Sequence, residues 1–120
     1  MPMDEFEARL AKVRHRFAGS LESKLNDTMT AFAKLSVEVP DAPENVDQTY
    51  RRIHSICGVA PTVGFAATGR TARAAEVLLL APMRDKRGLT QDESAAFKKA
   101  IGELWRAAHL ELQAMYGRGG

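Results

Sequence analysis

The amino-acid sequence predicts an all-α protein, an antiparallel up-down four-helix bundle with an additional or extended N-terminal helix. Apolar residues recur at intervals of three or four along most of the chain, which is the spacing of amphipathic helices. No alternating run of β-branched residues indicates a strand. Proline and glycine are sparse and leave only short connections between the helical segments, which favours helices packed antiparallel to one another.

The first helical segment is expected between Asp4 and Leu35. It has one apolar stripe, made of Phe6, Leu10, Val13, Phe17, Leu21, Leu25, Phe32 and Leu35. A helix of this length exceeds the later segments, because each residue adds about 1.5 Å. We therefore expect either a bend near Gly19 and Ser20, where glycine is a poor helix former, or a first section that overhangs the bundle.

The second helix is expected to begin near Asp41, because Asp41 and Glu44 have the spacing of a capping box. It should stop or kink at Pro61, which lacks an amide hydrogen. Its inner face would consist of Val46, Thr49, Ile53, Ile56 and Ala60. The third helix is expected from about Phe65 to Ala81. Its inner stripe of mostly small residues would consist of Thr68, Ala72, Ala75 and Leu79.

The fourth helix has the clearest start in the chain. Thr90 followed by Glu93 three residues later is the signature of a capping box, in which each side chain bonds the other residue's backbone amide. A three-four repeat of apolar residues follows, with Phe97, Ile101, Leu104, Ala108, Leu112 and Met115.

The chain has 120 residues and is 45% hydrophobic, which suits one domain with one core. We expect residues 1–16 to form the extra helical section, 17–116 the bundle and 117–120 a disordered tail. Lys and Arg number 17 against 15 Asp and Glu without a basic run, so no nucleic-acid partner is expected. A lone cysteine, no recognisable signal peptide and no apolar stretch of membrane-spanning length favour a cytoplasmic protein without a membrane partner.

His54 is expected at the edge of the second helix's buried face. At about 100° per residue, Ile53 points toward the inner stripe, while Gly58 follows one turn after His54 on the same line. A glycine inside a helix costs about 1 kcal/mol relative to alanine, so we interpret Gly58 as clearance for a partner that approaches the imidazole. From periodicity alone, an ordinary solvent-edge histidine beside a helix-end glycine remains an open alternative.

The segment from His54 to Phe65 resembles the signature of histidine phosphotransfer (HPt) domains, and it is most similar to the phosphorylated N-terminal domain of the chemotaxis kinase CheA. That family has a histidine, a glycine four residues on and another glycine ten residues on, which His54, Gly58 and Gly64 match. Phe65 matches a frequent aromatic, and Glu76 matches a glutamate that hydrogen-bonds the histidine. The likeness extends over most of the chain, but its specific content lies between His54 and Glu76.

The resemblance implies a phosphocarrier. His54 would accept a phosphoryl group at Nε2 while its Nδ1–H is held by Glu76, and would exchange the group with the aspartate of a response-regulator receiver domain. A sensor or hybrid histidine kinase would be a further partner. The chain has no P-loop and no kinase-type glycine loop, so we expect no nucleotide site and no stably bound cofactor. The Mg²⁺ ion is expected on the receiver.

One residue departs from the family pattern, because Cys57 stands where the family has a lysine. Arg73, three residues before Glu76 on the same helix face, is the candidate for the missing positive charge, with Arg51 and Arg70 as lesser candidates. A solvated surface arginine is the alternative for Arg73. The docking face is expected to consist of Arg51, Ser55, Cys57, Gly58, Val59, Pro61, Thr62, Gly64 and Arg70.

Three other functions compete with this interpretation. Loss of the lysine suits a phosphorylation-incompetent helical module that only docks partners or dimerises. Cys57 would suit redox sensing if nearby arginines lowered its pKa. A metal site at His54 and Cys57 would need a third ligand, and His15 and His109 lie far away in the sequence.

Overall fold

The computed structural model describes residues 4–119, and it is all-α as the sequence predicted. The helices are α1 (Glu5–Ala31), α2 (Ala42–Val59), α3 (Ala66–Val77), α4 (Leu80–Arg84) and α5 (Gln91–Gly119), with short 3₁₀ helices η1 (Phe32–Leu35) and η2 (Ala60–Val63). No strand occurs in this range, and a single isolated bridge joins Ser36 to Leu89.

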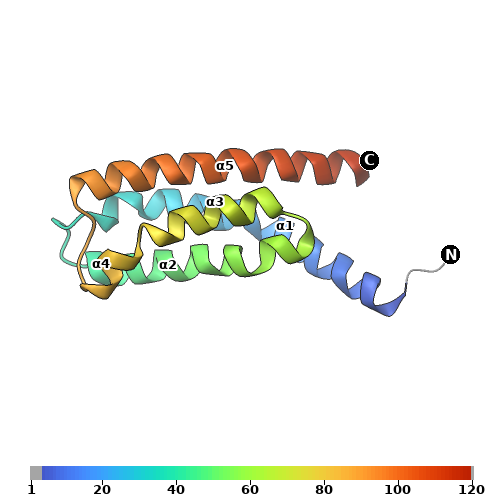
Figure 1. Ribbon diagram of the computed structural model, residues 1–120, viewed down its shortest axis with the longest axis horizontal. Coiled ribbons are helices and arrows are strands. Elements are labelled where there is room, and N and C mark those ends of the chain that lie inside the picture. The colour runs from blue at the N-terminus through green and yellow to red at the C-terminus, as the bar shows by residue number, and fades with distance from the viewer. Residues whose placement is uncertain (1–3, 120) are drawn as a thin grey trace.

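The four longer helices run side by side, and successive ones run in opposite directions (Figure 1). Helix α2 packs against α1 and α3, and α5 packs against α3 and, over a shorter stretch, α1. The short helix α4 lies in the connection from α3 to α5 and contacts α2. Helix α1 passes Gly19 without interruption, and its first section, together with the last section of α5, reaches beyond the turn between α2 and α3 (Figure 1).

The predicted inner stripes form most of the core. The buried apolar residues include Phe17, Leu21 and Leu25 of α1, Ile53 and Ile56 of α2, Ala72 and Ala75 of α3, and Phe97, Leu104 and Ala108 of α5. The stripe predicted for the first segment leaves this core at its N-terminal end. Phe6 is 73% exposed and Val13 is 39% exposed, while Leu10 is only partly buried.

Of the two capping boxes that the sequence predicts, one is formed and the other is not. The predicted capping box at Thr90 is present, with Glu93 N–H donating to Thr90 Oγ1 at 3.2 Å and Thr90 N–H donating to Glu93 Oε1 at 2.9 Å. Asp41 occupies the N-cap position of α2, but its side chain makes no capping hydrogen bond, so the capping box predicted with Glu44 is not formed. The turn before α2 is tied instead by backbone bonds such as Ala42 N–H to Val39 O.

Two predicted boundaries are wrong. The third helix does not continue to Ala81, because α3 ends at Val77 and α4 begins at Leu80. Pro82 explains the break, since its ring would clash with the carbonyl four residues earlier and it has no amide hydrogen to bond that carbonyl. Helix α5 continues to Gly119, into the segment predicted as a disordered tail, while Gly120 lies outside the described residues.

Candidate functional site

His54 lies on the outward edge of α2. Its side chain is 60% exposed, while the neighbouring Ile53 is fully buried in the core. One turn before it, Tyr50 places its ring parallel to the imidazole, with ring centroids 5.5 Å apart and an interplanar angle of 13°. This stacking supports one face of the imidazole, while the side chain as a whole stays largely exposed. The role of Tyr50 was not predicted, although its spacing of four residues from His54 places both on one helix face.

Glu76 of α3 supplies the carboxylate beside the imidazole. Its side chain is 4% exposed, and its Oε2 lies 3.2 Å from His54 Nδ1. Tyr50 Oη donates to Glu76 Oε1 at 3.5 Å. When Nδ1 carries the proton, this contact fixes the tautomer and the ring angle and leaves the lone pair on Nε2. Among residues 4–119, no hydrogen bond to Nε2 is found.

Arg73 and Cys57 complete the surroundings of Glu76. Arg73 Nη1 lies 3.5 Å from Glu76 Oε1, although the arginine side chain is 69% exposed. Burial on its own would raise the pKa of Glu76, but hydrogen bonds with Cys57 and His54 and the charges of His54 and Arg73 hold the pKa below its ordinary value. The carboxylate is therefore ionised near neutral pH. A buried carboxylate with several partners is well suited to orient a histidine.

Cys57 behaves as a neutral, half-buried thiol. Burial, followed by the hydrogen bond to Glu76 and the negative charge of that carboxylate, raises its pKa to about 12. The charge of Arg73 does lower this pKa, as the redox alternative supposed, but burial and Glu76 outweigh it. The thiolate needed for redox chemistry is thus disfavoured. Cys57 adds no positive charge beside His54.

The surface around His54 is open on the side toward the end of α2. A Cβ atom added to Gly58 would have no neighbour within 4 Å. The predicted docking residues are exposed at Arg51, Ser55, Val59, Pro61, Thr62, Gly64 and Arg70. Gly64 has a φ of 89°, in the left-handed region that favours glycine, and it turns the chain from η2 into α3. Neither Arg51 nor Arg70 forms an ion pair within the part of the chain that the structure describes.

A second cation that the sequence did not indicate comes from α1. Lys24 Nζ donates to Ser55 Oγ at 3.3 Å, which places an ammonium group beside the residue that follows His54. Lysine and serine are 31 residues apart, so no local pattern connects them. The site therefore has Arg73 on the α3 side and Lys24 on the α1 side.

Other classes of site find no support in the described range. No group of three or more His, Cys, Asp or Glu side chains among residues 4–119 is placed to hold a metal ion. No helix in that range has the length and apolar character needed to cross a membrane. No protein-family model, curated protein or solved structure matches this chain. The candidate site consists of an exposed imidazole with one nitrogen held by a buried carboxylate and with no hydrogen bond to the other nitrogen from residues 4–119.

Proposed function

We propose that this protein is a cytoplasmic histidine phosphotransfer protein of a two-component phosphorelay, with its longer helices forming an antiparallel up-down four-helix bundle extended at the N-terminus. The observation that carries the proposal is the contact of 3.2 Å between Nδ1 of the exposed His54 and the buried Glu76 carboxylate. A surface histidine without a chemical role needs no such partner. The donor and acceptor would be the aspartate of a receiver domain, and a sensor or hybrid histidine kinase would feed the relay.

The proposed step is a phosphoryl transfer with the chain's own residues in defined roles. The Nε2 lone pair attacks the phosphorus of the receiver's aspartyl phosphate, and an N–P bond forms while the P–O bond to the aspartate breaks. The aspartate leaves as a carboxylate with the bonding electron pair. The proton remains on Nδ1, where the Glu76 carboxylate compensates the positive charge that develops on the ring. The receiver supplies Mg²⁺, and the reverse step returns the phosphoryl group.

Positive charge near the incoming phosphoryl group would come from arginine and lysine of neighbouring helices instead of the family lysine. Arg73 is anchored near the site by Glu76 at 3.5 Å, and Lys24 is anchored by Ser55 at 3.3 Å. Arg73 is 69% exposed and Lys24 is partly exposed, so both long side chains have room to turn toward a phosphoryl group.

The test uses all three histidines of the chain. A panel of receivers is phosphorylated with a radiolabelled small phosphodonor and mixed with the protein. We expect transfer of an acid-labile label to the wild type and to the control variants His15→Gln and His109→Gln, but not to His54→Gln. Label on the His54→Gln protein would reject this site. Receiver binding without transfer to the wild type would favour the docking module, for which the neutral Cys57 in place of lysine is the supporting observation.

A further inference from the structure

The two ends of the chain form a pair of helical arms whose inner parts contact η2 and α3 and whose outer parts expose large apolar residues. We call residues 5–16 of α1 and 109–117 of α5 the arms, and their outer ends extend past the turn between α2 and α3 (Figure 1). The apolar stripe of α1 continues into its arm as Phe6, Leu10 and Val13, at spacings of four and three. Phe6 and Val13 are exposed, so a seam that is buried further along the helix is open here.

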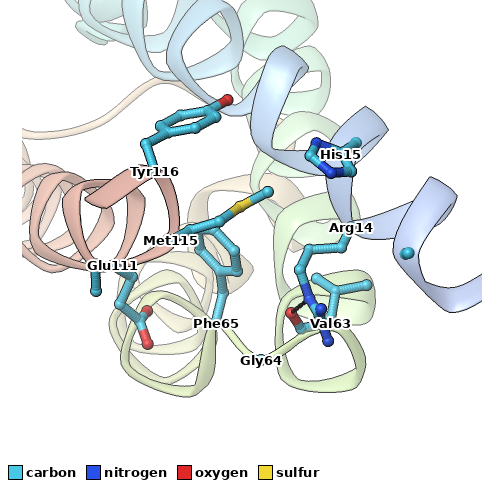
Figure 2. Close-up of a pocket in the computed structure, with 10 residues that line it drawn as sticks. Arg14, His15, Val63, Gly64, Phe65, Glu111, Met115 and Tyr116 are labelled. Carbon is cyan, nitrogen blue, oxygen red and sulfur yellow. Dashed lines mark hydrogen bonds between the residues drawn. The ribbon is translucent and has the colours of Figure 1, made fainter. Parts of the chain in front are cut away.

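A pocket of about 780 Å³ lies between the arms. Figure 2 shows Arg14 and His15 on one side, Met115 and Tyr116 on the other, and Phe65 at the base. Arg14 is tied to the base of the pocket because its Nε donates to Val63 O at 2.9 Å. Tyr116 is 56% exposed, and its ring adds to the apolar surface. The pocket is therefore an apolar hollow framed by polar groups, which suits an apolar side chain.

The charges along the α1 arm identify that occupant. The acidic residues Asp4, Glu5 and Glu7 all lie at its start, and the basic residues Arg9, Lys12, Arg14 and Arg16 all follow. A second arm packed antiparallel would set each acidic turn against a basic stretch, whereas a parallel pairing would set like charges together. The spacing of Phe6, Leu10 and Val13 is that of a helix–helix seam. The arm is therefore complementary to itself in charge, and its apolar spacing suits a helix–helix contact.

We propose that the protein forms a two-fold symmetric homodimer in which the arms of two copies pack antiparallel. Each α1 arm lays its apolar residues against the other copy, with Phe6 entering the pocket bounded by Met115, Tyr116 and Phe65. A two-fold interface uses the same patch on both copies, which a self-complementary arm satisfies. Two arms from each copy then make a four-helix contact. His54 itself does not line this pocket, so the dimer does not require phosphoryl transfer, although Gly64 belongs both to the predicted docking face and to the pocket lining.

Sedimentation equilibrium tests the dimer directly. We expect twice the chain mass of 13.2 kDa for the wild type and the monomer mass for Phe6→Ser combined with Leu10→Ser. Val37→Ser is the matched control, because Val37 is 53% exposed in the loop after η1 at the opposite end of the molecule, and it should remain dimeric. A wild type that stays monomeric up to roughly 1 mM overturns the proposal. A double serine variant that dimerises like the wild type also overturns it.

A charge exchange tests the antiparallel arrangement. One variant combines Glu5→Lys and Glu7→Lys, and the other combines Arg9→Glu and Lys12→Glu. The first arm then has six basic residues against Asp4, and the second has five acidic residues against Arg14 and Arg16. Two copies of the same variant repel each other, so each variant alone should dimerise at least tenfold more weakly. A mixture of the two should recover the dimer, with circular dichroism confirming equal helix content. Failure of the mixture to recover, or unweakened dimers of the separate variants, contradicts the antiparallel arms.

Discussion

Gly58 offers a perturbation in which stability and activity should move in opposite directions. A Cβ atom at this position meets no atom within 4 Å, and α2 has ordinary helical geometry around it. Gly58→Ala therefore adds a better helix former without a clash. Such replacements stabilise by about 0.4–1 kcal/mol, because the unfolded chain loses conformational freedom. For a chain of this size the melting temperature should rise by about 2–5 °C.

Activity should fall because the added group occupies the space beside the imidazole. Gly58 follows His54 by one helical turn, so a longer side chain projects over the same surface. In Gly58→Glu the carboxylate both blocks the receiver and repels the phosphoryl group. We expect its transfer rate to drop at least tenfold, which corresponds to about 1.4 kcal/mol in the transition state. Gly58→Ala should show an intermediate rate.

The assay pairs radiolabel transfer from a phosphorylated receiver with thermal unfolding followed by circular dichroism. Gly102→Glu is the matched control, since Gly102 is an exposed helical glycine on α5 whose added Cβ also meets nothing within 4 Å. It should gain stability and keep full transfer. Normal transfer by Gly58→Glu would refute the clearance argument. A loss of stability in Gly58→Ala would refute the structural account of an unobstructed position.

Three further predictions concern charge and capping. Cys57→Lys should extend the lifetime of the phosphorylated form about two- to fivefold, the effect of an additional partly exposed ion pair, as measured by loss of label with time. The bidentate bond from Arg87 lowers the Glu93 pKa to about 2, so the stability that Glu93 contributes is complete above pH 4.5 and lost toward pH 2. Glu93→Gln should thus cost about 1–2 kcal/mol in chemical denaturation at pH 7, after solvent screening is included, and the gap to the wild type should narrow below pH 4.5. Glu111→Gln should lower the free energy of unfolding by about 1–2 kcal/mol and lower the melting temperature. The reason is that Glu111 accepts hydrogen bonds from the backbone N–H groups of Ala67 and Thr68 at the start of α3. An unchanged melting temperature would contradict this capping role.

The fold class and much of the core could be predicted because helical periodicity is a local property. Residues three or four apart share a helix face. Spacing alone therefore assigns Ile53 and Ile56 to the buried face and His54 to its edge. The capping box at Thr90 is local for the same reason. The break before Pro82 was also open to local reasoning, since a proline inside a helical pattern perturbs the preceding turn. The break was not predicted because the apolar residues around Pro82 fit the helical repeat.

The contacts that cross between helices could not be read from spacing. Lys24 reaches Ser55 from another helix, and Glu111 caps α3 from α5 over more than forty residues of sequence. The thiol of Cys57 has a raised pKa because it is half-buried beside Glu76, whereas the sequence displayed only the arginines nearby. Pairing of His54 with Glu76 was expected from a resemblance rather than from periodicity. Long-range packing decides each of these cases.

Burial of the ionised Glu76 side chain costs free energy, and this cost favours a chemical role for the site. A carboxylate that is 4% exposed loses most of its hydration, and a buried charge is retained only with several partners. Here those partners are His54, Arg73, Tyr50 and Cys57, and two of them are largely exposed. A helix interface that served packing alone would be at least as stable with an apolar residue of similar volume. The arrangement instead keeps one ionised oxygen against Nδ1 of a largely exposed imidazole, which is what a nucleophilic histidine requires. Glu76→Leu should consequently preserve or raise thermal stability while it slows phosphoryl acceptance at His54, and equal losses of both would mean that the carboxylate serves the fold alone.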